Sequence, residues 1–163
     1  MDRVDQIIDQ WRRERPDIAS DSMGLFGRMK RLIAHLTPEL ETVFAEHGLS
    51  AAGFDVLATL RRSGQPYALT PSDLIAWTMV TSGTMTNRID RLIDEGMVER
   101  RRNPADGRGF VIALTRKGKK VIDAAVGDHV ANQKRLMSAL TEKERAMLDD
   151  LLKTWLGAFE GDA

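Results

Sequence analysis

Thr81 to Gly118 reads TSGTMTNRIDRLIDEGMVERRRNPADGRGFVIALTRKG, and this stretch decides the fold. Its first part carries apolar residues at the spacing of one helix face and stops at Gly96, a residue typical of helix ends. Its second part predicts two strands, 97–101 and 109–114, joined by a turn rich in Asn, Pro, Asp and Gly. Because a two-stranded hairpin is unstable alone in water, we expect it to pack against the preceding helix.

The N-terminal third of the chain predicts two helices. The first carries apolar residues at helical spacing and ends before Pro16, since proline disfavours the helical conformation in the residue before it. Asp21 or Ser22 is expected to cap the second helix, which Gly48 closes. Pro38 lies inside this second helix, where we expect it to kink or restart the helix.

Two further helices are predicted before the deciding stretch. Ser50 has the position of an N-cap, and the helix after it stops near residues 64–66, Gly-Gln-Pro. Thr70 and Pro71 follow as an N-cap and a first helical residue, a place where the missing N–H of proline costs nothing. The helix that they open is short.

Two helices are expected to follow the hairpin. Thr115 caps a long one that runs to about residue 139, and residues 141–144 form a capping box that opens the last one. The last helix offers more apolar surface than a short terminal helix can hide, so we expect a partner chain to cover it, with packing inside one chain as the alternative. These residues are Met147, Leu148, Leu151, Leu152, Trp155, Leu156 and Phe159.

The order of elements predicts a fold class. It is a mainly α protein with a small β-hairpin wing, which is the arrangement of a winged helix-turn-helix. A chain of 163 residues suits a single domain with a real core.

Charge is unevenly distributed along the chain, although the net charge is zero. Residues 61–120 hold 12 of the 24 Lys and Arg but 6 of the 24 Asp and Glu, which makes this segment +6. The remainder is therefore −6. A basic middle between acidic flanks suits a DNA-facing module on a less basic scaffold, and chance clustering is the alternative.

Several function classes find no support in the sequence. The chain has no cysteine, and its three histidines, His35, His47 and His129, do not have the spacing of metal ligands. There is no glycine-rich phosphate loop and no nucleophile elbow. We therefore expect no enzyme, no cofactor and no metal. Neither a signal peptide nor a run of about 18 apolar residues is present, so no membrane partner is expected and the cytoplasm is the default location.

The helix before the hairpin has a polar outward face. Thr81 or Ser82 is expected to cap it, and on a helical wheel Met85, Ile89, Leu92 and Ile93 form the inward stripe. Asn and Arg pair with adenine and guanine edges in the major groove, while hydroxyls near a helix N-terminus hold phosphates. We expect DNA contacts from Ser82, Thr84, Thr86, Asn87 and Arg91; the alternative is an ordinary solvated helix face.

The hairpin carries four arginines near its tip. Of these, Arg101, Arg102 and Arg108 are expected to contact DNA, because arginines on a thin ribbon can enter the minor groove and its negative potential. The alternative is a charged turn that keeps an edge strand from aggregating. Four arginines are more than that purpose needs.

These residues resemble the core of the MarR family of bacterial regulators. The resemblance spans roughly residues 20–160, and the motifs that carry it are Ser82–Leu92, Glu95–Arg100, Asn103–Gly109 and Leu114–Gly118. In the family's wing signature, Asp is usually followed by two arginines. Here Gly107 occupies the first of those positions and Arg108 keeps the second, so we do not expect DNA binding to be lost.

The resemblance implies an organisation and a function. Residues 1–163 would form a single MarR-like domain, with dimerisation helices in 1–48 and 116–163 and a DNA-binding lobe in 49–115. The chain would be a sequence-specific transcriptional regulator that binds a pseudo-palindromic operator as a homodimer. Repression relieved by a small ligand is common in the family. The alternative is a winged-helix module that binds proteins and not DNA; its outward face would be apolar and poor in Arg and Asn.

Two motifs also resemble one branch of the family, whose members include repressors that sense urate or other small anionic metabolites. The resemblance is carried by Trp11 with Glu14–Ile18, and by Gly53–Leu57. The ligand set of that branch falls here on Trp11, Asp55, Arg88 and Arg100. A planar anion would be held by arginine and stacked on Trp11.

Each member of that set also has an ordinary interpretation. Trp11 on an apolar stripe suits a dimer core, and Asp55 suits a solvated surface position. Arg88 flanks the apolar stripe of its helix and can contact phosphate, while Arg100 can be a strand-edge charge. Urate is therefore a hypothesis for the effector.

Overall fold

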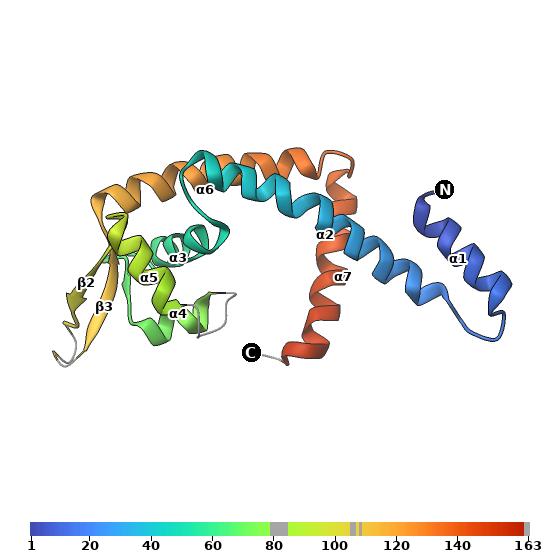
Figure 1. Cartoon of the computed structure of the whole chain (residues 1–163), viewed down its shortest axis with the longest axis horizontal. Coiled ribbons are helices and arrows are strands. Elements are labelled where there is room, and N and C mark those ends of the chain that lie inside the picture. The colour runs from blue at the N-terminus through green and yellow to red at the C-terminus, as the bar shows by residue number, and fades with distance from the viewer. Residues whose placement is uncertain (79–84, 105–106, 108, 162–163) are drawn as a thin grey trace. The chain divides into compact units, whose positions relative to one another are not determined.

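The computed structural model describes residues 1–78, 85–104, 107 and 109–161 (Figure 1). The elements are α1 (Arg3–Glu14), α2 (Asp21–Glu46), α3 (Ala51–Arg62), β1 (Ala68–Leu69), α4 (Pro71–Trp77), α5 (Met85–Asp94), β2 (Val98–Arg102), β3 (Phe110–Leu114), α6 (Arg116–Leu136) and α7 (Glu142–Glu160). The chain forms two compact units, Met1–Thr42 and Val43–Ala163, which we call the N-terminal unit and the main unit. The predicted fold class, mainly α with a small sheet, is confirmed.

In the N-terminal unit, α1 packs against α2 through small residues. Val4 and Ile8 of α1 are buried, and the glycines of α2 let the two helices approach. A Cβ on Gly27 would lie 3.2 Å from Val4 Cγ1, and one on Gly24 would lie 3.6 Å from Ile8 Cγ1. The apolar spacing that predicted α1 therefore marks the face that α2 covers.

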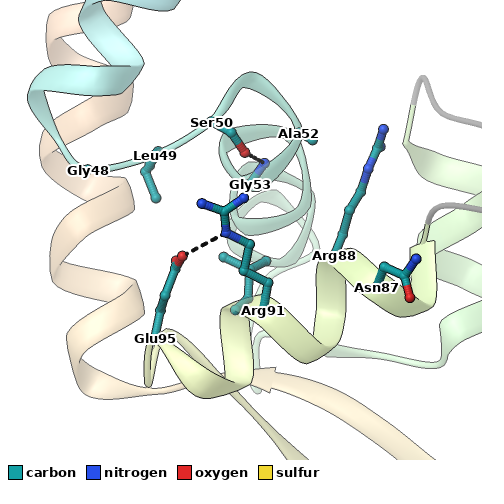
Figure 2. A pocket seen from close by; sticks show the side chains of 10 residues that line it. Gly48, Leu49, Ser50, Ala52, Gly53, Asn87, Arg88, Arg91 and Glu95 are labelled. Carbon is teal, nitrogen blue, oxygen red and sulfur yellow. Dashed lines mark hydrogen bonds and ion pairs between the residues drawn. The ribbon is translucent and has the colours of Figure 1, made fainter.

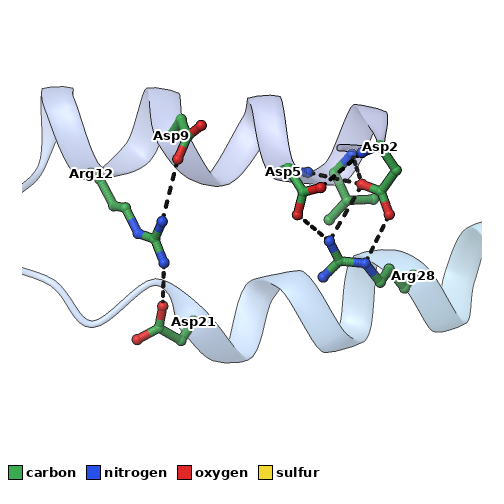
Figure 3. A network of polar contacts seen from close by, with 7 residues as sticks. Asp2, Asp5, Asp9, Arg12, Asp21 and Arg28 are labelled. Carbon is green, nitrogen blue, oxygen red and sulfur yellow. Dashed lines mark hydrogen bonds and ion pairs between the residues drawn. The ribbon is translucent and has the colours of Figure 1, made fainter.

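Ion pairs flank this contact (Figure 3). The Arg28 guanidinium pairs with the carboxylates of Asp2 and Asp5, at 2.9 Å for Asp2, and Arg12 pairs with Asp21 at 2.8 Å. All these groups are exposed to solvent, which screens their charges, so each pair contributes little to the stability of the unit. The pairs help to set the position of α1 along α2 more than they stabilise the contact between the two helices.

Helix α2 continues through Pro38. It runs without interruption from Asp21 to Glu46, so the expected restart at Pro38 is wrong, and the alternative, a kink at Pro38, stays a prediction. The Thr42 hydroxyl donates a hydrogen bond to the Pro38 carbonyl at 2.9 Å, within the turn that follows the proline.

Helix starts in the main unit follow the predicted caps. Hydroxyls accept hydrogen bonds from backbone N–H groups at Ser50 (3.1 Å from Gly53), Thr70 (3.1 Å from Asp73), Thr115 (3.0 Å from Gly118) and Thr141 (3.3 Å from Glu144). The Glu144 carboxylate accepts from the Thr141 N–H at 2.7 Å and so completes the capping box. These four predictions are confirmed, and they rest on local chemistry alone.

The sheet has three strands in the order β1-β3-β2, all antiparallel. The sequence predicted only the hairpin of β2 and β3, in which Val98 pairs with Leu114 and Arg102 with Phe110. The additional strand β1 pairs Leu69 with Ile112 on the other side of β3. Because β3 is central, its residues 111–114 are all buried.

A close approach joins the sheet to α6. A Cβ on Gly118 would lie 1.9 Å from the Met97 carbonyl oxygen, so this position accepts only glycine. The Thr115 hydroxyl donates to the Gly96 carbonyl at 2.8 Å, and Lys117 Nζ donates to the Glu95 carbonyl at 2.7 Å. The end of α5, the start of β2 and the start of α6 are thus held at one point.

Helix α7 differs from the other helices of the main unit. All of it is described, and none of its residues is buried. Apart from Trp155, which is half-buried, its large apolar side chains are exposed as the sequence predicted, up to 78% for Phe159. Among the described residues, no helix is both long enough and apolar enough to cross a membrane.

Candidate nucleic-acid interface

Helix α5 presents the polar face that its sequence predicts. Met85, Ile89 and Leu92 are buried, and Thr86 and Asn87 are exposed on the opposite side. Arg91 is also exposed, with its side chain 76% accessible and its Nε donating to Glu95 Oε1 at 3.2 Å. The predicted cap at Thr81 or Ser82 and the expected contacts of Ser82 and Thr84 lie outside the described residues.

The wing exposes consecutive arginines on its edge strand. Arg101 Nε donates to Glu99 Oε1 at 2.9 Å, and Arg102 Nε donates to the Gly107 carbonyl at 2.8 Å. Gly107 has a φ of +64°, a left-handed conformation that a side chain would strain. Arg108, the remaining arginine expected at the tip, lies outside the described residues. In Figure 1 the hairpin starts near the C-terminal end of α5 and projects away from α4.

An ion pair joins the wing to α5. Arg100 Nη2 donates to Asp90 Oδ1 at 2.6 Å, and the same guanidinium lies 5.3 Å from the centre of the Phe110 ring. Asp90 comes from α5, Arg100 from β2 and Phe110 from β3. Through these contacts, Arg100 fixes the positions of α5 and the two strands of the hairpin relative to one another.

A cavity of about 350 Å³ lies between α5 and the start of α3 (Figure 2). Its lining residues are Gly48, Leu49, Ser50, Ala52, Gly53, Asn87, Arg88, Arg91, Leu92 and Glu95. The side chain of Arg91 extends from α5 toward the start of α3, with Glu95 beside it. Arg88 Nη1 is buried, and no described residue forms a hydrogen bond with it.

Comparison with known proteins decides the family. Residues 47–109 match the MarR family. The chain is 39% identical, over 149 residues, to the HTH-type transcriptional regulator PecS of Dickeya dadantii, and the match covers 91% of this chain and 90% of that one. The chain belongs to the MarR family.

Other members of the MarR family agree in sequence and in structure. The HTH-type transcriptional repressor YetL of Bacillus subtilis is 28% identical over 83% of this chain and 81% of its own length. The crystal structure of a mutant MarR from E. coli, complexed with operator DNA, superimposes with a TM-score of 0.70. That structure is 29% identical and covers 85% of this chain and 99% of its own.

The four residues that the MarR family resemblance suggested for an effector belong to both units. Trp11 belongs to the N-terminal unit. In the main unit, Arg88 lines the cavity, whereas Asp55 and Arg100 are not among its lining residues. Arg100 is paired with Asp90 instead. Of the three members of the set in the main unit, only Arg88 lines the cavity.

A cluster of aromatic rings around His129 was not predicted. The rings of Phe44 and Phe54 stack at 4.3 Å, and the His129 ring lies 5.1 Å and 4.9 Å from them. Burial lowers the pKa of His129 below its ordinary value. A signal existed in the sequence, since Ile122, Ala125 and His129 recur on one helix face.

Proposed function

We propose that this MarR family chain is a homodimeric, ligand-responsive repressor that binds a pseudo-palindromic operator through α5 and the wing of each subunit. The observation that carries the proposal is the ion pair of Asp90 with Arg100, which holds a polar helix face and an arginine-bearing edge strand together in one unit. The relatives support the same function, since they are named transcriptional regulators and repressors, and one structure of MarR holds operator DNA. The proposal includes no catalytic step and no cofactor, and a protein that binds the bacterial chromosome works in the cytoplasm.

Each DNA-facing group has a proposed role. Asn87 and Arg91 of α5 contact base edges in the major groove, and Thr86, with Ser82 and Thr84, contacts phosphates. Arg101, Arg102 and Arg108 of the wing lie along the minor groove. The exposure of Thr86, Asn87 and Arg91 in the free protein supports this arrangement.

Selection of operator fragments from genomic DNA, followed by fluorescence anisotropy, tests the proposal. We expect affinity for the selected operator to fall steeply as salt rises, because phosphate contacts release counterions. Asn87→Ala is expected to relax sequence choice, while Arg102→Ala weakens binding to all sequences. A protein that binds no duplex in low-salt buffer but captures a protein partner would favour the winged-helix protein-binding module instead.

The dimer is proposed to form through residues 1–48 and 116–163, with residues 49–115 as the DNA-binding lobe of the single MarR-like domain. Exposed apolar side chains on both segments support this division, among them Phe26 and Ile33 of α2 and Leu151 and Phe159 of α7. Exposed apolar surface of this extent favours a partner. Light scattering on the purified protein is expected to give twice the mass of the chain.

A small anion is the proposed effector, with urate as the first candidate. The cavity beside α5 supports an anion site there, as does the buried Nη1 of Arg88, which has no hydrogen-bond partner among the described residues. Trp11, Asp55 and Arg100 stay in the proposed set on the resemblance alone. We expect urate to lower operator affinity in the native protein and to have no effect in Arg88→Gln. If millimolar urate leaves both tryptophan fluorescence and DNA affinity unchanged, the urate proposal is wrong.

A further inference from the structure

A second cavity, of about 420 Å³, lies between the C-terminal end of α3, β1 and the C-terminal end of α4. Its described lining consists of Thr59, Arg62, Ser63, Leu69 and Trp77, none of which lines the cavity beside α5. Small-molecule sites typically have volumes of about 300–1,000 Å³. The second cavity is therefore large enough for a ligand of its own.

Trp77 gives this cavity a flat apolar wall. It is the last residue of α4, and it is 65% exposed although its neighbour in the chain, Thr78, is buried. Exposed apolar surface costs roughly 25 cal/mol per Å² relative to burial, so an indole left in water favours any flat group that covers it. Stacking on an aromatic ring adds about 0.5–1.5 kcal/mol to that gain.

Arg62 gives the same cavity a charge without a counter-charge. Its Nη2 donates to Thr59 Oγ1 at 3.2 Å and to the carbonyl oxygen of Trp77, both of which are neutral. Among the described residues, no Asp or Glu forms an ion pair with Arg62. The adjacent Arg61 differs, because it pairs with Asp123 at 2.5 Å.

The hydroxyls of the cavity are already engaged. The Ser63 hydroxyl donates to the Leu60 carbonyl at 2.8 Å, and the Thr59 hydroxyl accepts from Arg62. Among the described residues, Arg62 donates through Nη2 alone, so its Nε and Nη1 donors are unused there, and a planar guanidinium can pair with the two oxygens of a carboxylate.

We propose that the cavity between α3, β1 and α4 binds a planar organic anion, with its ring against Trp77 and its carboxylate on Arg62. The site is separate from the one proposed at Arg88. Binding draws the guanidinium toward the anion and away from the Trp77 carbonyl, which it caps at the end of α4. Since α4 directly precedes α5, occupancy changes how α5 is presented to DNA, a consequence that rests on the proposed function.

Fluorine NMR on protein labelled with 5-fluorotryptophan tests the site without DNA. The three tryptophans, Trp11, Trp77 and Trp155, give separate probes, and Trp77→Phe assigns the signal of interest. We expect 2-naphthoate to shift the Trp77 signal and to leave the other two in place. The neutral 2-naphthamide, the same ring without the charge, is expected to bind at least about tenfold more weakly.

Variants separate the charge of Arg62 from general effects. Arg62→Gln is expected to weaken 2-naphthoate binding at least about tenfold, because it removes the only proposed partner of the carboxylate. Lys134→Gln removes an exposed positive charge elsewhere in the main unit and is expected to leave binding unchanged. The fold of each variant is checked by circular dichroism, and Arg62→Lys is the second variant, expected to keep partial binding through its charge.

Three results would overturn the proposal. The first is an unshifted Trp77 signal at millimolar 2-naphthoate, and the second is equal affinity for the acid and the amide. The third is an unchanged affinity for 2-naphthoate in a correctly folded Arg62→Gln variant. A protein that binds 2-naphthoate at Trp77 but binds no DNA would support the site and remove the proposed function.

Discussion

The core around α3 and the surface of α7 have the same kind of sequence pattern, but the apolar side chains are buried in the first and exposed in the second. Leu57, Leu60 and Leu74 in the core are fully buried, whereas Leu151 and Phe159 of α7 are mostly exposed. Both segments carry leucines at helical spacing, so the pattern alone predicts an apolar face and not what covers it. The comparison separates apolar residues that stabilise the fold of the subunit from apolar residues that are available for an interface with a partner chain.

Gly118→Ala is expected to have the largest effect on stability, since it disrupts the junction between the end of α5, the start of β2 and the start of α6. The new Cβ would lie 1.9 Å from the Met97 carbonyl oxygen, so backbone must move. We expect a loss of more than about 4 kcal/mol of unfolding free energy, as in the most disruptive single substitutions. Chemical denaturation measures it.

Gly127→Ala is the matched control on the same helix. Nothing lies within 4 Å of a Cβ at Gly127. Alanine favours helix over glycine by about 1 kcal/mol, so this variant is expected to be slightly more stable than the native chain. If Gly118→Ala were as stable as Gly127→Ala, the close approach of α6 to β2 would be wrong.

The same substitution in the two regions sharpens the comparison directly. Leu60→Ala is expected to cost about 2–5 kcal/mol of unfolding free energy, because it leaves a cavity in the core. Leu151→Ala removes side chain that is already 63% exposed, so it is expected to weaken the dimer about tenfold with little effect on the fold of the subunit.

Denaturation midpoints and the concentration dependence of the dimer, from sedimentation, give the two measurements for this leucine pair. A Leu151→Ala variant that unfolds as readily as Leu60→Ala, with an unchanged dimer, would mean that α7 stabilises its own subunit.

The ion pair between α5 and the wing is expected to affect DNA binding more than stability. Asp90 and Arg100 are about half-exposed, so Arg100→Gln is expected to cost less than about 1 kcal/mol of stability. We expect operator affinity to fall roughly fivefold, the equivalent of about 1 kcal/mol, as the helix and wing lose their fixed relation.

A double-mutant cycle isolates the contribution of this pair. Asp90→Asn with Arg100→Gln is expected to bind DNA no more weakly than either single variant. Lys153→Gln breaks an exposed ion pair with Asp149 in α7 and is expected to leave operator affinity unchanged. Additive losses in the cycle would show that Arg100 contacts DNA by itself.

The smallest expected effect is a pH dependence from His129. Because burial lowers its pKa, the folded state favours the neutral ring, and stability is complete above the ordinary pKa of about 6.5. Stability is expected to fall as pH drops through that value toward the lower pKa of the folded state.

Thermal unfolding between pH 7 and pH 5 measures the contribution of His129. We expect His129→Phe, which suits the rings of Phe44 and Phe54, to flatten the profile by a few degrees at the acid end. An unchanged slope in this variant would assign the pH dependence to other groups.

Local chemistry explains which parts of the fold were predictable. The caps at Ser50, Thr70 and Thr115 depend on groups within three residues, and the sequence places them correctly. Strand β1 has two residues, too few for an alternating pattern, and its pairing partner Ile112 lies far along the chain. No periodicity in a sequence can indicate such a strand.

The candidate site, too, has features that the sequence predicts and features that it does not. The outward face of α5 follows from helical geometry, so Asn87 and Arg91 were placed correctly as exposed residues. The choice of Asp90 as the partner of Arg100 depends on how the hairpin packs, and the cavity at Arg88 depends on where α3 begins. Neither is encoded in the spacing of residues along one element.

Strand β2 combines a fully paired backbone with exposed side chains. Val98 is buried, while the next four side chains, residues 99–102, are all exposed, and the whole strand is paired along its length with the buried β3. Arg100 is kept for its ion pair with Asp90, and randomising positions 99, 101 and 102 would therefore leave the packing of the lobe intact. A library built on this strand is a practical starting point for engineering variants with altered operator preference.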